Sequence, residues 1–322
     1  MTLAFFLITY CFKVVYCNFA LKVDCITLIM QRIESVFAPS AEERASYIIE
    51  GVLEIPEGVT QIGEDSFSDC REFYSIVFPS TLVSVGARAF ARCQALEGVE
   101  FNDGLEEIGE DAFAACTSLE EIELPASVTF IGRSAFQCCR SLLCARLGCA
   151  AKHIRPFTFS YCTALQEIIL PDTLEYIGCA AFCGCSALRE VAFPDSLKAF
   201  DWVENESDGN TIHGVFEDCS SLRSIYIPEG VEKICDDIFK GCSALREVSI
   251  PSSVKTIGQM AFAGCSSLAC VELHEGLEII LGGAFGDCPS LCHIDIPESV
   301  KEVDPGAFFD SGIPGSPKSE DF

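Results

Sequence analysis

The chain has 322 residues, and its 48 aspartates and glutamates outnumber its 21 lysines and arginines, which gives a net charge of -27 at pH 7. Binding of nucleic acid or of an anionic membrane requires clustered cations, so this balance argues against both. Apolar residues make up 49% of the chain, which excludes a disordered protein. The acidity either keeps the protein soluble or attracts a basic partner, and the composition leaves both interpretations open.

Residues 1–48 precede any regular pattern and are expected to form an apolar segment followed by a helical cap. Residues 2–12 are apolar, but no basic residue precedes them and Lys13 interrupts the run. A secretory signal requires a basic start, an unbroken apolar stretch and a cleavage site, and this run matches those requirements poorly. Three interpretations of the run therefore stay open. The run is a signal or membrane anchor, or an apolar cap, or the product of a start site upstream of the real one at Met30.

Two short helices are predicted before the repeats begin. Apolar residues between positions 23 and 37 fall at helical spacing, and Pro39 ends that pattern. Ser40 and Glu43 have the spacing of a capping box, which predicts a second short helix. Because the terminal coil of a repeat array lacks a neighbour, a helix at this place is expected to cover it.

From about residue 49 onward the chain repeats itself. Phenylalanine recurs every 23 residues, except for one gap of 34 residues that holds 11 additional ones. The series is Phe67, Phe90, Phe113, Phe136, Phe159, Phe182, Phe216, Phe239, Phe262, Phe285 and Phe308. A fixed period of this length is typical of a solenoid, in which each coil buries its apolar face against the next. We therefore expect about eleven stacked coils over residues 49–311.

The first part of each unit predicts a short strand. In the unit that spans residues 119–139, Leu119, Ile122 and Leu124 form the spacing L-x-x-I-x-L, which buries alternate side chains of a strand. Pro125 follows and ends the strand, since proline has no N–H to donate. Every coil enters in the same direction, so strands of successive coils must be parallel.

The second part of the unit is expected to form tight turns or short helical segments. It contains the apolar pair Val128 and Ile131, followed by Gly132. We expect this glycine to permit a tight turn that other residues would resist. Phe136 is expected to fill the centre of the coil, and Cys139 to close it.

Cysteine is frequent, with 21 copies in the chain, and ten of them share one position of the unit. These are Cys70, Cys93, Cys116, Cys139, Cys162, Cys185, Cys219, Cys242, Cys265 and Cys288. A thiol behaves as a small apolar group with a weak donor, so we expect a buried cysteine ladder. The absence of paired C-x-x-C spacings argues against a zinc site. So many thiols would be liable to mispair in an oxidising compartment, which favours a cytoplasmic location, with secretion or the cell surface as the alternative.

The pattern L-x-x-I-x-L-P-x-x-L-x-x-I-G-x-x-A-F-x-x-C, as it stands in Leu119–Cys139, closely resembles the leucine-rich repeats of the BspA-like, Treponema pallidum class. The resemblance covers residues 50–311. It implies a leucine-rich-repeat solenoid built on parallel β-strands. It also implies a surface or adhesive binding module without catalytic activity of its own.

The repeat is interrupted near residues 201–214 and ends at Ser311, where the last cysteine should be. Trp202 lies in the inserted loop, and we expect it to anchor a partner or to pack as a lid over a neighbouring coil. The acidic residues of that loop lack the spacing of a calcium-binding loop, so no metal is predicted there. Residues 312–322 are expected to be a disordered tail.

The outward positions of the strands form the candidate binding face. These are the third and fifth positions of the unit, with the leading leucine counted as the first. Read along the stack, the candidate partner-binding residues are Glu100, Glu121, Glu123, Arg146, Glu167, Glu190, Tyr226, Glu247, Glu272 and Asp295, together with Trp202. Arg146 is the only fixed cation among them. The face is either a groove for a basic peptide or protein, or a solvated surface that resists aggregation.

Catalysis has little support in the sequence. The four histidines, His153, His213, His274 and His293, are expected to lie far apart in the stack, and no phosphate-binding, dinucleotide-binding or metalloprotease motif occurs. We therefore expect no enzyme activity, no cofactor and no small-molecule substrate. The primary hypothesis is a non-enzymatic module for protein–protein interaction. The alternative is a secreted or surface-exposed adhesive or structural protein.

Overall fold

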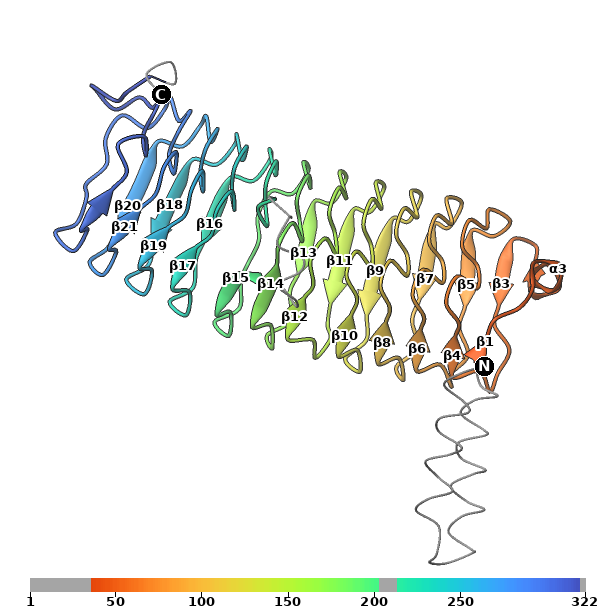
Figure 1. Ribbon diagram of the computed structural model, residues 1–322. Coiled ribbons are helices and arrows are strands. Elements are labelled where there is room, and N and C mark those ends of the chain that lie inside the picture. The colour runs from red at the N-terminus through yellow and green to blue at the C-terminus, as the bar shows by residue number, and fades with distance from the viewer. Residues whose placement is uncertain (1–35, 203–212, 319–322) are drawn as a thin grey trace, which may run out of the picture. The chain divides into compact units, whose positions relative to one another are not determined.

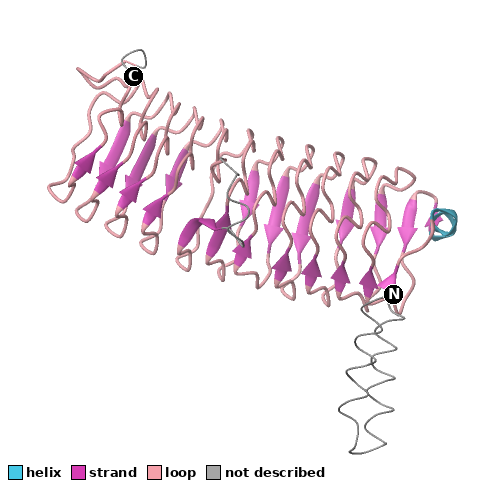
Figure 2. Ribbon diagram, in the orientation of Figure 1, coloured by secondary structure: helices cyan, strands magenta, loops and turns pink. Residues whose placement is uncertain are grey.

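The computed structural model describes residues 36–202 and 213–318, and in the unit that begins at Phe37 the repeats stack as parallel coils (Figure 1). Each regular coil contains two short strands that turns connect, so the strands form two rows along the stack (Figure 2). The prediction of a parallel leucine-rich-repeat solenoid is confirmed.

The first row of strands comes from the L-x-x-I-x-L segments. It consists of β3 (Val52–Glu54), β5 (Ser75–Val77), β7 (Gly98–Glu100), β9 (Glu121–Leu124), β11 (Cys144–Leu147), β13 (Glu167–Ile169), β16 (Ser224–Tyr226), β18 (Glu247–Ile250) and β20 (Cys270–Leu273). The burial pattern of β9 alternates as expected: Ile122 and Leu124 are buried, and Glu121 and Glu123 are exposed. In the parallel ladder Glu121 lies beside Cys144 of β11, 23 residues later, so one repeat in sequence is one step of the stack.

A second row of strands was not foreseen. It consists of β4 (Gln61–Ile62), β6 (Ser84–Val85), β8 (Glu107–Ile108), β10 (Phe130–Ile131), β12 (His153–Ile154), β14 (Tyr176–Gly178), β15 (Ala199–Trp202), β17 (Lys233–Ile234), β19 (Thr256–Ile257), β21 (Ile279–Ile280) and β22 (Glu302–Val303). Most have only two residues, which is too short for alternation to show in the sequence. Their parallel partners lie one coil away, as Phe130 and Ile131 pair with Glu107 and Ile108. The region predicted to hold turns or helical segments therefore contains strands and turns.

The first row of strands is broken once within the stack. A seven-stranded sheet runs from β2 (Ile48–Ile49) to β13, and a three-stranded sheet contains β16, β18 and β20. The coil between them, residues 188–194, follows the same path without strand pairing (Figure 2). This coil directly precedes the 11-residue insertion, so the irregularity of the sequence and that of the sheet fall in the same place.

The phenylalanines of the repeat form a stacked column through the core. Phe113, Phe136 and Phe159 are completely buried. The ring of Phe136 lies 5.5 Å from each of the other two, with planes within 5° of parallel. Each ring therefore fills the space between two coils, and the column joins coils that are far apart in sequence.

The glycine that follows the second apolar pair serves a different purpose from the one predicted. Gly132 does not have a positive φ. A Cβ at this position would lie 2.4 Å from the carbonyl carbon of Gly109 and 2.5 Å from the nitrogen of Glu110. The left-handed residues of this coil are instead Ser134, with φ 54°, and Cys138, with φ 59°. The prediction of a glycine-dependent turn is thus wrong: Gly132 lets the backbones of two coils touch.

The regular cysteines form the predicted buried ladder, and each thiol also has a hydrogen-bond partner. Cys162 is completely buried, and its Sγ donates to the main-chain oxygen of Phe136, at 3.2 Å. The same contact, one coil further on, joins Cys185 to the oxygen of Phe159. Burial raises the pKa of the Cys162 thiol well above its usual value, so the group stays protonated and donates.

This contact leads to a test with two substitutions at one position. Replacing Cys162 by alanine should lower the free energy of unfolding by about 0.5–1.5 kcal/mol, because the oxygen of Phe136 would lose the thiol donor and keep only the hydrogen bond from the Cys139 N–H, at 3.3 Å. Replacing Cys162 by serine should cost less, since the hydroxyl can donate to the same oxygen. Urea denaturation followed by circular dichroism measures both. Equal losses for the two variants would show that the hydrogen bond contributes nothing.

At the N-terminal end of the stack the predicted capping box forms, and a short strand pairs with the first strand of the first row. The helix α3 (Ala41–Arg44) begins with a capping box, in which Ser40 Oγ accepts from the Glu43 N–H at 3.3 Å and Glu43 Oε2 accepts from the Ser40 N–H at 2.8 Å. A single 3-10 turn, η1 (Ala45–Tyr47), and the strand β2 (Ile48–Ile49) follow, and β2 pairs antiparallel with β3.

The first predicted helix falls mostly outside the described residues, as does the apolar run at 2–12. Its last two residues, Val36–Phe37, form the strand β1 instead of helix. The main-chain oxygen of Phe37 accepts from the Gly63 N–H at 2.9 Å, and its ring packs 6.0 Å from that of Phe67. Phe37 thus extends the second row of strands and the phenylalanine column by one position. In the residues that the structure describes, no helix is long and apolar enough to span a bilayer.

The C-terminal residues pack against the last coil as far as Lys318. The Gly312 N–H donates to the oxygen of Cys288 at 3.1 Å, and Asp310 N–H donates to the oxygen of Pro317 at 2.9 Å. Ile313 is partly buried against the core. The segment expected to be a disordered tail from residue 312 therefore follows a defined path as far as residue 318, with a turn at residues 314–315, and the last four residues lie outside the described part.

Candidate functional site

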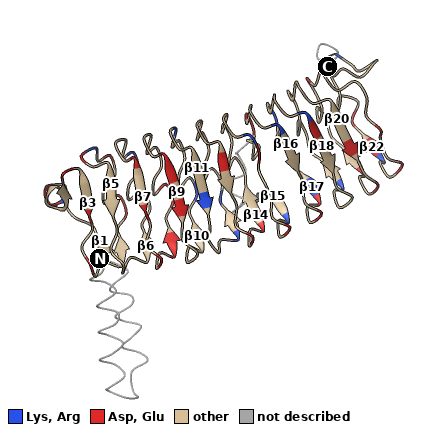
Figure 3. Cartoon of the chain, turned by 180° about the vertical axis from the view of Figure 1, so that it is seen from behind, with Lys and Arg blue, Asp and Glu red and all other residues tan. Residues whose placement is uncertain are grey.

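The first row of strands presents the face on which most candidate residues lie. Glu100, Glu121, Glu123 and Glu167 are exposed on β7, β9 and β13, and we call these four residues the acidic patch. Their strands are consecutive in the sheet except that β11 lies between β9 and β13. Because neighbouring strands are about 4.8 Å apart, the four carboxylates form one cluster. Figure 3 shows the acidic residues of β9 beside the basic residue of β11.

Arg146 of β11 is the one basic residue in register with the patch. It pairs in the ladder with Glu123, and its Nη1 lies 4.0 Å from Glu123 Oε2. The two side chains are 50% and 77% exposed, so water screens this contact and it adds little stability. One partly engaged guanidinium faces four carboxylates, and the patch keeps a net negative charge.

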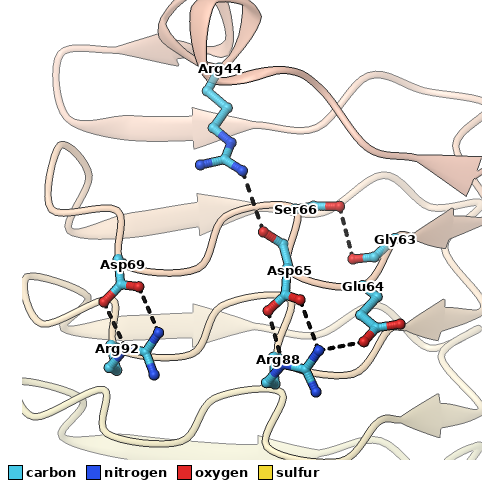
Figure 4. Close-up of polar contacts among 8 residues, drawn as sticks. All are labelled: Arg44, Gly63, Glu64, Asp65, Ser66, Asp69, Arg88 and Arg92. Carbon is cyan, nitrogen blue, oxygen red and sulfur yellow. Dashed lines mark hydrogen bonds and ion pairs between the residues drawn. The ribbon is translucent and has the colours of Figure 1, made fainter.

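Two arginines of the N-terminal coils, Arg88 and Arg92, are bound at the turns, away from the strands (Figure 4). Arg88 Nη2 lies 2.9 Å from Asp65 Oδ2 and also contacts Glu64, and Arg92 Nε lies 2.6 Å from Asp69 Oδ1. Hydrogen bonds from these guanidinium groups lower the pKa of both aspartates. These cations are therefore engaged with carboxylates of the preceding coil.

Lysines of the central coils are engaged in the same way. Lys152 and Lys198 both contact Glu175, which lies beside the second row of strands. Their hydrogen bonds lower the pKa of Glu175 to about 2. Cations in this part of the stack thus neutralise acids elsewhere, and the acidic patch retains its charge.

Three further candidates lie on the separate three-stranded sheet. Tyr226, on β16, is 64% exposed, and Glu247 and Glu272 are exposed on β18 and β20. In the ladder Tyr226 pairs with Ser249, which in turn pairs with Glu272. The strandless coil at residues 188–194 separates this group from the acidic patch.

The remaining candidates are not on the strands of this face. Glu190 is exposed in the strandless coil, and Asp295 is exposed in the last coil, where its Oδ1 lies 2.9 Å from His293 Nε2. Trp202 ends β15, in the second row of strands, and pairs with Gly178. The structure therefore does not bring the backbone of Trp202 to the acidic patch. Its side chain and residues 203–212 lie outside the described part.

A row of arginines at the edge of the candidate binding face was not predicted from the sequence. Arg189, Arg223 and Arg246 occupy the second position of three consecutive units and are exposed. Their main chains are joined by hydrogen bonds from Arg223 N–H to the oxygen of Arg189, and from Arg246 N–H to that of Arg223. The same position holds Glu97 and Glu120 beside the acidic patch. Reading the second position along the repeat reveals this change from acidic to basic.

Parallel coils of 23 residues, with leucine, phenylalanine and cysteine buried at fixed positions, define a leucine-rich-repeat solenoid. The sequence profile of the BspA type leucine rich repeat region matches residues 50–163, 152–202 and 211–314, with six copies. The chain belongs to this family, and the resemblance drawn from Leu119–Cys139 is confirmed. None of the curated proteins matches the sequence.

Several solved bacterial structures have a similar fold. A leucine rich cell surface protein from Faecalibacterium prausnitzii is 26% identical, with a TM-score of 0.54, and the match covers 80% of this chain and 79% of that one. A leucine-rich repeat protein from Eubacterium ventriosum is 22% identical, with a TM-score of 0.50 and coverage of 84% and 85%. The T. pallidum leucine rich repeat protein is 24% identical, with a TM-score of 0.37 and coverage of 68% and 78%.

Proposed function

We propose that this chain is a non-enzymatic protein-binding module whose acidic patch receives a basic segment of a partner protein. The observation that carries the proposal is the exposure of Glu100, Glu121, Glu123 and Glu167 on neighbouring strands with only Arg146 as a local counter-charge. Carboxylates this close repel one another, so a cation that approaches the patch relieves repulsion as well as gaining attraction.

The form of the surface favours a protein over a small molecule as the partner. The patch is a set of side chains on a sheet face, with successive strands about 4.8 Å apart, and it spans four strands from β7 to β13. Lysines and arginines on an extended or helical segment can contact several such rows at once. Charge complementarity of this kind speeds association and selects partners more than it adds raw affinity.

The experiment compares two variants with the same change in charge. Replacing Glu121, Glu123 and Glu167 by lysine should weaken capture of basic partners by about tenfold or more, because three attractive contacts become repulsive. The matched control replaces Glu106, Glu107 and Glu110, which are exposed on and beside β8 in the second row of strands, by lysine. Each protein is immobilised and offered extract of the native cell, and the retained proteins are quantified by mass spectrometry.

The proposal expects a set of proteins that the wild type and the control variant retain and the patch variant loses. Retention of the same set by the patch variant would remove the acidic patch from the function. Equal losses in both variants would show that total charge, and not this face, attracts the partner, and would also contradict the proposal.

A second candidate function is that of a surface-exposed adhesive or structural protein. It is favoured by the similarity to the F. prausnitzii protein, which is described as a cell surface protein. The ladder thiols are buried, so once folded they are protected from mispairing in either compartment. Mass spectrometry of the natural N-terminus distinguishes the two locations. Processing near residues 17–20 would support export, whereas a chain that begins at Met1 or Met30 would support a cytoplasmic protein.

A further inference from the structure

His213, at the end of the insertion that interrupts the repeat, lies beside two buried polar side chains of the stack, Cys183 and Glu217. Cys183 directly follows Phe182, and Glu217 directly follows Phe216, so the two residues occupy the same position in consecutive coils. A hydrogen bond from the Gly184 N–H to the main-chain oxygen of Glu217, at 2.8 Å, joins the two coils here. Both side chains are buried, although this position holds alanine in other coils, at Ala91, Ala114 and Ala263.

His213 completes the group from the end of the insertion. Its Nδ1 lies 2.8 Å from Glu217 Oε2, and one ligand atom from each of Cys183, His213 and Glu217 lies within 4.8 Å of the other two. His213 is 50% exposed at its side chain, and that of Glu217 only 10%. The three groups thus form a cluster of possible metal-ligand atoms that is exposed to water on the side of His213.

We propose that Cys183, His213 and Glu217 bind a zinc ion, with water in the fourth position. A thiolate, an imidazole and a carboxylate are the three ligand types that zinc takes in proteins. Bond lengths of about 2.0–2.3 Å in a tetrahedral site place ligand atoms about 3.5 Å apart. Side-chain rotations that move these ligand atoms by about 1 Å would therefore bring all three to bonding distance from one zinc ion. Binding displaces the thiol proton of Cys183 to solvent, since the thiolate is the ligand.

The charges around the group favour a divalent cation. Asp218 follows Glu217 directly in the sequence, and Asp237 lies in the next coil. Lys240 of that next coil contacts carboxylates of both coils: its Nζ is 3.2 Å from Glu217 Oε1 and 3.1 Å from Asp237 Oδ1. Lys240 therefore binds one oxygen of Glu217 and leaves Oε2, on the side of His213, for the metal. The positive charge of the lysine is balanced by Asp237, so it does not cancel the carboxylate at the site.

The test is titration of the whole, reduced protein with cobalt(II), a spectroscopic substitute for zinc, and then with zinc itself. We expect one cobalt per chain with a thiolate-to-cobalt charge-transfer absorption, lost on addition of zinc. Zinc should also raise the melting temperature, because it binds the folded state. Calorimetry of zinc binding gives the affinity, which should fall about 10- to 100-fold or more when one ligand is removed.

Two variants and one control make the result specific. Cys183→Ala should fold, since alanine occupies this position in other coils. His213→Ala should also fold, because it removes an exposed side chain. Both variants should lose the cobalt absorption and the zinc-dependent rise in melting temperature. Cys270→Ala removes an exposed thiol elsewhere and should change neither. Absence of the absorption in the wild type, or its persistence in Cys183→Ala, would overturn the proposal. Partner capture by the acidic patch is a separate assay, so the two proposals can fail independently.

Discussion

Replacing Phe136 by alanine should lower the free energy of unfolding by about 3–5 kcal/mol. The ring is completely buried between those of Phe113 and Phe159, at 5.5 Å from each. Main-chain hydrogen bonds hold the coils on both sides at their spacing, so the structure cannot collapse into the space that the ring leaves. The substitution therefore loses both the transfer free energy of the ring and its packing contacts.

The measurement is urea denaturation followed by far-ultraviolet circular dichroism. Because neighbouring coils support one another, we also expect a broader transition in the variant, as the two halves of the stack become less coupled. Phe130→Ala is the matched control in the same coil. That ring is 36% exposed, with the guanidinium carbon of Arg155 4.1 Å above its centre, and its loss should cost about 1 kcal/mol or less. Similar losses for both substitutions would show that the column does not determine stability.

Replacing Gly132 by alanine should lower the free energy of unfolding by about 3 kcal/mol, although it adds a single methyl group. The new Cβ would lie 2.4 Å from the carbonyl carbon of Gly109 and 2.5 Å from the nitrogen of Glu110. Both neighbours are main-chain atoms held by the ladder, so neither can rotate away as a side chain would. The two coils must move apart, and the hydrogen bonds and core contacts between them weaken together.

Gly98 supplies the control for this substitution. It lies on β7, has no positive φ, and a Cβ there would meet no atom within 4 Å. Gly98→Ala should therefore stabilise the protein by about 0.4–1 kcal/mol, because alanine has less conformational freedom to lose on folding. The same urea experiment measures both variants. A loss for Gly132→Ala below about 1 kcal/mol would mean that the coils can separate locally at little cost.

Several elements were predictable because they depend on residues close together in sequence. The capping box of Ser40 and Glu43 is a local hydrogen-bonded pattern, and it forms as predicted. The buried alternation of β9 follows from the spacing of Ile122 and Leu124. The second row of strands could not be predicted in the same way, because a two-residue strand such as Phe130–Ile131 exists only through pairing with the coils beside it.

The candidate site was predictable only in part. The exposure of Glu121, Glu123 and Glu167 follows from the period of the strand. The loss of strand pairing at residues 188–194 and 291–297 could not be inferred, so Glu190 and Asp295 were placed on strands that the structure does not contain. The proximity of His213 to Cys183 was equally hidden, because the 11 inserted residues obscure the register that brings the two coils together.

The sequence alone determined the solenoid, its period, its buried columns of phenylalanine and cysteine, and the family. These features repeat, and a repeated residue reports the same environment many times. The tertiary structure decided what depends on contacts between coils. It gave Gly132 its role in close backbone contact and provided nine of the ten ladder thiols, from Cys93 to Cys288, with a main-chain acceptor. It also separated Trp202 from the acidic patch and placed Cys183, His213 and Glu217 together. Such contacts join residues one coil apart, where local spacing carries no information about distance.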